Sequence, residues 1–361
     1  MLAIFGPLAV YGIVLGLHLV LPGRWIDGYV LDPATGRPLR YRLNGLRVLF
    51  VTVAAWALAC ELGWIPREFF YVHRWEMTAG ACGLGLLFTL GMVLPARPNK
   101  DLPKKSLLAD LYLGRLANPQ WGGGRVDAKM FLYLVGAVML ELNLLSFTAY
   151  HVQAHPSDLS NGVILYTLLF SFFVVEYLNF EEVHLYTYDI MAERVGFKLG
   201  WGCLVFYPFF YPIGLWAVAD LPDPHAPAPL LVGYGLLFFA GWTLARGANL
   251  QKFWFKRDPK AKAFGLLEPR AISGDGKHVL AGGFWGLSRH INYLGEILMA
   301  TALTLCLGYP LEFAPWLYPL YYVALLFPRQ YFDDRRCAER YGPLWDEYRR
   351  RVPSRIIPGI Y

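Results

Sequence analysis

Residues 131–150 read FLYLVGAVMLELNLLSFTAY and carry a single charge, on Glu141. About 20 mostly apolar residues are enough to cross the hydrocarbon of a bilayer as one helix. Eight further stretches of this kind occur along the chain, at 2–21, 45–64, 76–95, 162–180, 197–219, 229–245, 292–309 and 311–328. The sequence therefore predicts an all-α, polytopic membrane bundle with about nine to ten spans. The last two stretches are short and contain prolines, so a re-entrant pair is the alternative there.

The composition supports a membrane protein. Of 361 residues, 56% are hydrophobic and only 17% are charged, whereas soluble domains carry roughly 25% charged residues. This excludes an ordinary soluble enzyme, a disordered chain and a small disulfide scaffold. The five cysteines show no paired spacing, so neither a disulfide framework nor a metal site is indicated. The net charge of +6 is explained by loops that face anionic lipid, and no nucleic-acid partner is expected.

The basic residues predict the orientation of the chain. Of the 33 Lys and Arg residues, 29 lie in five connecting segments that an even number of predicted spans separates, at 22–44, 96–130, 181–196, 246–291 and 329–361. By the positive-inside rule this side is cytoplasmic. The 23 Arg against 10 Lys favour a bacterial inner membrane, with the endoplasmic reticulum as the eukaryotic alternative. We expect one integral-membrane domain over 1–361, with scaffold spans in 1–95.

The first candidate for chemistry is the stretch FWGLSRHINYLGE at 284–296, which opens a predicted span. A helix N-terminus offers unpaired N–H groups to a phosphate. Arg289 adds a bidentate phosphate donor and Trp285 a flat face for a ring. The alternative is an arginine that snorkels to the interface beside an aromatic belt.

Two further segments carry charge next to predicted spans. Residues 246–257 continue a span into the cytoplasm, and Asn249, Lys252 and Lys256 share one face there. Simple anchoring by positive charge is the alternative. Five residues of the tail recur at helical spacing, so we expect one face of a helix to carry all of them. They are Arg329, Asp333, Cys337, Tyr341 and Tyr348. The alternative for the tail is a helix held to lipid phosphates.

The fourth candidate is EEVHLYTYD at 181–189, directly after an apolar run. Ionisable groups near membrane depth are functional candidates. Glu181, His184 and Tyr188 are therefore candidate proton donors. A polar cluster that caps two helix ends is the alternative.

Together these regions resemble the sterol reductase family, which includes Δ14-sterol reductase, 7-dehydrocholesterol reductase, sterol C24(28) reductase and the membrane part of lamin B receptor. The resemblance covers about 111–361. It rests on several motifs in one order, LGRLANP at 113–119, DAKMF at 127–131, TYDI at 187–190, GF at 196–197, GFWGLSRHINYLG at 283–295, CAERYG at 337–342 and RVPSRIIPGIY at 351–361.

The resemblance implies a multi-span helical fold with NADPH in a cytoplasm-facing pocket of the C-terminal half. Carried over by position, Lys252 and Lys256 would hold phosphates. The rest of the pocket would be Leu280, Trp285, Arg289, Asn292, Tyr293, Arg329, Asp333, Cys337, Tyr341 and Tyr348. The implied chemistry is reduction of a carbon–carbon double bond in a sterol or related polycyclic lipid, in which an acid protonates the alkene and NADPH delivers hydride.

The substrate half departs from the family pattern. His184 stands where relatives commonly have Tyr, and Cys203 where many have Asp. Two other functions are compatible with parts of the pattern. One is a membrane methyltransferase of the isoprenylcysteine type, which would use S-adenosylmethionine. The other is a non-catalytic, sterol-binding membrane scaffold, which would be expected to have lost its cofactor positions. The oligomeric state is left open.

Overall fold

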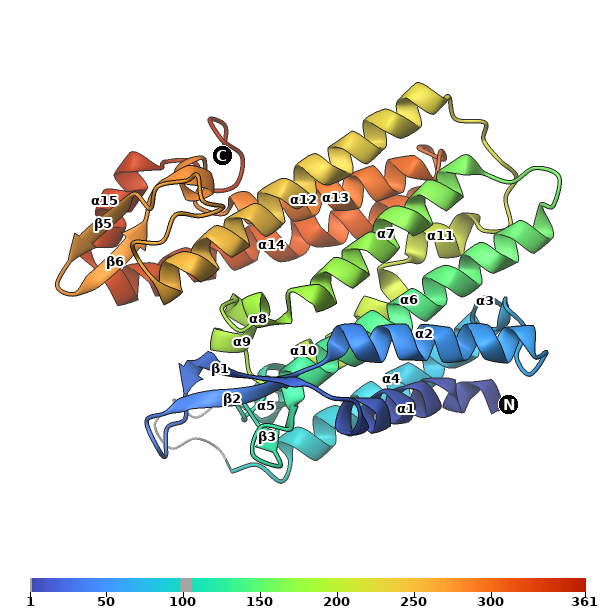
Figure 1. Ribbon diagram of the computed structural model, residues 1–361, viewed down its shortest axis with the longest axis horizontal. Helices are drawn as coiled ribbons and strands as arrows, with labels where there is room; N and C mark the ends of the chain where they lie inside the picture. The colour runs from blue at the N-terminus through green and yellow to red at the C-terminus, as the bar shows by residue number, and fades with distance from the viewer. Residues whose placement is uncertain (1, 98–105) are drawn as a thin grey trace. The chain divides into compact units, whose positions relative to one another are not determined.

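The computed structural model describes residues 2–97 and 106–361 and is mainly helical (Figure 1). The chain divides into two compact units, Met1–Asp223 and Pro224–Tyr361. The boundary falls in the Pro-rich segment 222–229, between two helices. The prediction of a single membrane domain stays a prediction.

Unit 1 is built around one long helix, α6 (Ala128–Ala154), most of whose side chains are buried. α6 packs against α1, α2, α7 and the π-helix η2. The helices of the unit after the short 3₁₀ turn Leu2–Phe5 are α1 (Gly6–Val20), α2 (Gly45–Glu61), α3 (Phe69–Val72), α4 (Arg74–Val93), α5 (Leu107–Leu113), α6, α7 (Asn161–Asn179), α8 (Glu181–His184), α9 (Tyr188–Ala192), α10 (Phe197–Trp201), η2 (Gly202–Phe210) and α11 (Ile213–Val218).

Two residues of the DAKMF motif fix the start of α6. The Asp127 carboxylate accepts hydrogen bonds from the backbone N–H groups of Lys129, at 3.1 Å, and Met130, at 3.0 Å, and so caps the helix. The Lys129 side chain is 1% exposed. Its ammonium donates to the carbonyl oxygens of Asp189, Ile190 and Glu193 around the end of α9. Lys129 therefore ties the segment that carries Tyr188 to the central helix.

Unit 2 consists of helices and one hairpin, with α12, α13 and α14 side by side (Figure 1). Its elements are α12 (Ala228–Arg257), β5 (Ala271–Gly274), β6 (Lys277–Leu280), the 3₁₀ turn η3 (Gly283–Gly286), α13 (Ile291–Cys306), α14 (Phe313–Tyr341) and α15 (Pro343–Arg351). α12 and α13 approach closely because glycines face each other. A Cβ atom added to Gly241 would lie 2.7 Å from the Gly295 carbonyl oxygen. Small residues at such crossings let helix backbones touch.

Every stretch expected to span the membrane is mainly helical, although the helices differ in length from the expectation. Six helical segments of the described residues are long and apolar enough to cross a bilayer, Leu2–Val20, Arg74–Val93, Ala128–Ala154, Asn161–Asn179, Phe197–Val218 and Ala228–Arg257. α13 is apolar but shorter, and α14 continues beyond the expected span to Tyr341. The figure of nine to ten crossings stays a prediction, while the helical membrane architecture is confirmed.

Three short antiparallel hairpins were not predicted. They pair β1 (Arg24–Leu31) with β2 (Pro38–Leu43), β3 (Gln120–Trp121) with β4 (Val126–Asp127), and β5 with β6. Asp275 and Gly276, in the turn between β5 and β6, both have positive φ, 48° and 70°. An Asp-Gly pair between short apolar runs is a signal for a tight hairpin. All three hairpins lie outside the predicted spans, so they leave the fold class unchanged.

Candidate functional site

One wall of the candidate cofactor site in unit 2 is formed by α12 and η3. The Lys252 ammonium lies 5.3 Å from the centre of the Trp285 ring. The Trp285 indole N–H donates to the Ala248 carbonyl oxygen at 2.8 Å, and the Tyr348 hydroxyl donates to the Trp285 carbonyl oxygen at 2.8 Å. The indole is therefore held in place beside the lysine by α12 and α15.

The opposite wall is α14. The Cys337 thiol lies within electrostatic reach of Asp333, Lys252 and Lys256. Burial, and then Asp333, raise the pKa of this thiol and the two lysines oppose the shift, which leaves the pKa at about 12. Cys337 is therefore a protonated, neutral side chain. The structure thus brings Lys252, Lys256, Trp285, Asp333 and Cys337 together, and their role in holding a cofactor stays a prediction.

The expectation that Tyr348 shares a helical face with Cys337 and Tyr341 is wrong. α14 ends at Tyr341, Gly342 takes a φ of 53°, and α15 starts at Pro343. A left-handed residue followed by proline cannot continue the preceding helix. Tyr348 nevertheless lies near Cys337, because both belong to a buried cluster with Ile272, Val279, Trp345 and Val352. Tyr341 joins the same cluster and stacks on Trp345.

The entrance to α13 supplies a third group of predicted residues. Asn292 donates to the Asn249 side-chain oxygen at 3.4 Å, and its own Oδ1 is buried with no partner among the described residues. Tyr293 stacks on His290. Burial lowers the pKa of His290 to about 3, against the opposing effect of Asp334. His290 is therefore neutral near pH 7 and forms no ion pair with Asp333, whose carboxylate lies 3.9 Å away.

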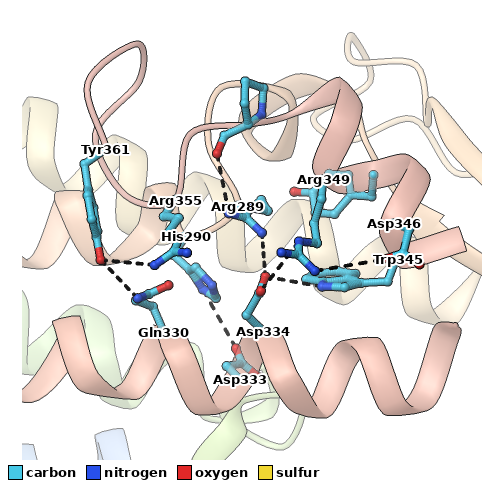
Figure 2. A network of polar contacts seen from close by, with 12 residues as sticks. Arg289, His290, Gln330, Asp333, Asp334, Trp345, Asp346, Arg349, Arg355 and Tyr361 are labelled. Carbon is cyan, nitrogen blue, oxygen red and sulfur yellow. Dashed lines mark hydrogen bonds and ion pairs between the residues drawn. The ribbon is translucent and has the colours of Figure 1, made fainter. Parts of the chain in front are cut away.

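Arg289 has a partner that the sequence did not indicate. Its Nη1 lies 2.6 Å from the Asp334 carboxylate, which also accepts from the Trp345 indole N–H at 3.2 Å (Figure 2). Phosphate binding by Arg289 stays a prediction. Two other predicted residues are located by the structure. Leu280 is buried on β6, and Arg329 lies on α14 within electrostatic reach of His290.

The candidate acids of unit 1 lie on α8 and α9. His184 is buried, stacks on the Tyr177 ring with centroids 3.9 Å apart, and places its Nε2 3.0 Å from the Tyr177 carbonyl oxygen. A carbonyl only accepts, so Nε2 carries a proton and Nδ1 is the site that changes protonation. Tyr188 is partly buried at the first turn of α9. The role of His184 and Tyr188 as acids stays a prediction.

Glu181 has the clearest electrostatic signature of the three. Its Oε2 accepts a hydrogen bond from the Gly45 N–H at 2.9 Å, at the start of α2. Burial raises the pKa of Glu181 to about 7, against the opposing effects of that hydrogen bond and of Arg24. Near neutral pH a carboxyl group of this kind exists partly as the acid, which is the form that can donate a proton.

The whole chain matches a known protein family. Residues 4–361 match the model of the ergosterol biosynthesis ERG4/ERG24 family. The chain belongs to this family. Among curated relatives it is 35% identical over 350 residues to a Delta(14)-sterol reductase of Arabidopsis thaliana, a match that covers 95% of this chain and 91% of the relative. It is 30% identical to a Delta(14)-sterol reductase of Methylotuvimicrobium alcaliphilum, covering 96% and 80%. It is 33% identical to the mouse Delta(14)-sterol reductase TM7SF2, covering 97% and 83%.

This member of the ERG4/ERG24 family also contains a buried acid that the sequence reasoning passed over. Glu141 lies on α6, is buried, and has one carboxyl oxygen without a hydrogen-bond partner among the described residues. Two residues on, Asn143 donates to the Pro208 carbonyl oxygen in η2 at 2.7 Å. The signal was present in the sequence, because Glu141 is the only charge in the apolar run 131–150. An intramembrane carboxyl group is a functional candidate by default.

We expect Glu181 to make stability depend on pH. Its pKa is about 7 in the folded protein and about 4.3 in an unfolded chain. Between these two pKa values the folded protein binds more protons at this position than the unfolded chain does. The free energy of unfolding therefore falls as the pH rises from about 4.5 to about 7, and it levels off above that. In Glu181→Gln this contribution disappears, while the amide oxygen still accepts from Gly45. The measurement is the thermal unfolding midpoint of both proteins across this pH range. Parallel pH profiles would contradict the shifted pKa.

Proposed function

We propose that this protein reduces a carbon–carbon double bond in a sterol or a related polycyclic lipid, with NADPH as the hydride donor. The observation that carries the proposal is the match of residues 4–361 to the ERG4/ERG24 family, together with the cluster of Lys252, Trp285, Asp333 and Cys337 in unit 2. The relatives named above are Delta(14)-sterol reductases, so the Δ14 double bond is the first candidate.

The residues of unit 2 fit a phosphorylated dinucleotide. Lys252 and Lys256 lie within electrostatic reach of each other, so one anionic group can meet both ammonium groups. Asp333 offers a carboxylate that accepts from hydroxyl groups, and Trp285 offers an aromatic face. The buried Oδ1 of Asn292, which has no hydrogen-bond partner among the described residues, is an acceptor that a bound amide or hydroxyl would satisfy.

When bound, NADPH supplies a hydride. The protein has to supply the binding, the orientation and the proton. The two lysines offset the charge of the phosphates. Cys337 is protonated and adds no negative charge beside Asp333. Trp285 is fixed by hydrogen bonds at both its side chain and its backbone, so a ring placed against it is held in one orientation.

An isolated alkene accepts hydride poorly until it is protonated, so an acid is required. We place this role in unit 1, with Glu181 as the first candidate because part of its population keeps a proton near neutral pH. His184 and Tyr188 are the alternatives, and His184 would act through Nδ1 because Nε2 faces the Tyr177 carbonyl oxygen.

The protein is an integral membrane protein with helices long enough to span the bilayer. We propose that the dinucleotide site faces the cytoplasm, because the segments that supply it, 246–291 and 329–361, hold much of the basic excess. The bacterial inner membrane, or the endoplasmic reticulum of a eukaryotic host, is the proposed location.

We expect NADPH to raise the thermal unfolding midpoint of the purified protein and Asp333→Asn to weaken its binding at least about tenfold. The physical reason is that the amide replaces a charged acceptor, and hydrogen bonds to charged groups are worth about 1.5–3 kcal/mol. The measurement is a titration of the midpoint against NADPH. Glu339→Gln, at an exposed carboxylate on the same helix, is the control. Equal affinities in Asp333→Asn and wild type would contradict the assignment of Asp333.

The reaction itself is tested with NADPH and a panel of Δ7, Δ14 and Δ24 sterols, with product masses as the readout. A gain of two hydrogen atoms in one sterol identifies the double bond. Stabilisation by S-adenosylmethionine in place of NADPH would replace the proposal with a methyltransferase. Tight NADPH binding without turnover of any sterol would point to a different lipid or to a scaffold.

A further inference from the structure

An open depression of 470 Å³, called the arginine cavity below, lies at the surface of unit 2 beside Arg289. It is lined by Arg289, Arg349, Arg350, Arg355, Asp346 and Pro353. Four guanidinium groups thus surround a space that a single carboxylate shares. In Figure 2, Arg289 and Arg349 both reach toward Asp334, whereas the Arg355 guanidinium reaches toward Tyr361. Apart from Arg289, none of these residues belongs to the predicted dinucleotide site.

Hydrogen bonds fix two walls of this cavity to each other. The Arg289 N–H donates to the Ser354 carbonyl oxygen at 3.0 Å, and the His290 N–H donates to the Arg355 carbonyl oxygen at 2.7 Å. The Ser288 hydroxyl donates to the Ile356 carbonyl oxygen at 2.8 Å. The third wall is α15, whose Trp345 is anchored on Asp334. The arginines therefore project from a fixed frame.

One of the lining arginines, Arg289, has a buried donor without a hydrogen-bond partner among the described residues. The Arg289 side chain is 4% exposed. Its Nη1 is paired with Asp334 at 2.6 Å, and its Nη2 makes a long contact of 3.4 Å to the Pro353 carbonyl oxygen. Its Nε is buried and has no hydrogen-bond partner within the described part of the chain. A buried N–H of this kind is costly unless something accepts from it.

The charges of the other arginines are only partly balanced. Arg349 makes long ion pairs, 3.9 Å to Asp334 and 3.8 Å to Asp346. Arg350 pairs with Glu347 at the exposed rim. Arg355 donates to the Tyr361 hydroxyl at 3.4 Å and makes no ion pair among residues 2–97 and 106–361. The residues that line the cavity therefore carry a net positive charge, and some of their N–H donors are not used in ion pairs.

We propose that this arginine cavity binds a phosphate group that carries at least two negative charges, at a second anion site separate from the dinucleotide site. Guanidinium forks match the oxygens of a phosphate in pairs. The cavity lies within the size range of about 300–1,000 Å³ that is typical of small-ligand sites. It leaves room for a substituent on the phosphate. That substituent is either the rest of a phosphomonoester lipid or a soluble phosphorylated molecule.

Two consecutive residues of α14 separate this site from the dinucleotide site. Asp334 faces Arg289, Arg349 and Trp345, whereas Asp333 faces His290 (Figure 2). Neighbours on a helix point about 100° apart. The arginine cavity shares only Arg289 with the predicted dinucleotide site, and Arg349, Arg350 and Arg355 line the cavity alone, so a failure of phosphate binding here is distinguishable from a failure of NADPH binding.

The test uses the full chain in phosphatidylcholine nanodiscs with saturating NADPH, and the thermal unfolding midpoint as the readout. One arm adds inorganic pyrophosphate, and the other replaces part of the lipid with phosphatidic acid. We expect stabilisation in at least one arm, and the arm that responds identifies the source of the phosphate. The double variant Arg350→Gln/Arg355→Gln is expected to weaken this response at least about tenfold. Arg335→Gln, an exposed arginine of the same unit, is the matched control.

Arg355→Lys separates recognition by a guanidinium fork from simple attraction of charge. It keeps the charge and loses the paired donors, so we expect an affinity below that of the wild type. Three results would overturn the proposal. These are no stabilisation in either arm, an unchanged response in the double variant, and a response that appears only when NADPH is left out.

Discussion

Replacing Asp334 with Ala is expected to destabilise the protein by about 3–5 kcal/mol, because it leaves a buried charge uncompensated. Asp334 holds the 4% exposed Arg289 at 2.6 Å and also accepts from the Trp345 indole. Without the carboxylate, the guanidinium stays buried with a carbonyl contact only. The measurement is the thermal or denaturant unfolding midpoint of the purified protein.

Asp346→Ala is the control for this prediction. Asp346 is 69% exposed and lies 3.8 Å from Arg349, and exposed pairs are worth at most about 1 kcal/mol. The double variant Arg289→Met/Asp334→Leu removes both charges and is expected to be more stable than Asp334→Ala. A midpoint for Asp334→Ala close to that of the wild type would show that Arg289 does not depend on this partner.

The second large effect is expected at the crossing of α12 and α13. A Cβ atom at Gly295 would meet the Gly241 carbonyl oxygen and would lie 2.5 Å from the Ala245 nitrogen. These are backbone atoms, so the two helices have to separate. We expect Gly295→Leu to cost about 3 kcal/mol, at the upper end of overpacking effects.

The same change is expected to weaken NADPH binding. Asn292 on α13 and Asn249 on α12 are joined by a hydrogen bond of 3.4 Å, which helix separation would break. Gly233→Leu is the matched control, because an added Cβ at Gly233 has no atom within 4 Å. The measurements are the unfolding midpoint and the NADPH titration. Equal losses in Gly295→Leu and Gly233→Leu would argue against a tight crossing.

Two pairs of residues in the unit 2 cluster could be predicted from local helix geometry, whereas the meeting of the two helices was expected only from the family resemblance. Lys252 and Lys256 are one turn apart on α12, and Asp333 and Cys337 are one turn apart on α14. Residues four apart share a helical face. The prediction failed at Tyr348, where Gly342 breaks the helix. The Gly342-Pro343 pair is a signal in the sequence for the end of a helix. Tyr341 and Tyr348 keep helical spacing on either side of this pair, and for that reason the break was not predicted.

The pairing of Arg289 with Asp334 was beyond sequence reasoning for a different reason. The two residues are 45 positions apart and approach only because the segment 287–290 packs on the segment 353–356. Asp333 and Asp334 are identical residues at adjacent positions, and only the packing of α15 decides which of them meets the arginine. The hairpins were not predicted because the elements expected from the sequence were long apolar runs, whereas the strands β5 and β6 have only four residues each.

The π-helix η2 affects how this protein is compared with its relatives. A π-turn accommodates one more residue than an α-turn, so the side chains that follow it are rotated around the helix axis. Cys203 and Tyr207 lie within η2, and Tyr207 contacts Tyr177, on which His184 stacks. In a relative whose corresponding segment is a regular α-helix, the residue at a given position in space would align in sequence with a different residue of this chain. Residues 202–210 of this chain and of such a relative are therefore equivalent only where their backbones superpose, and Cys203 is one of the positions to which this applies.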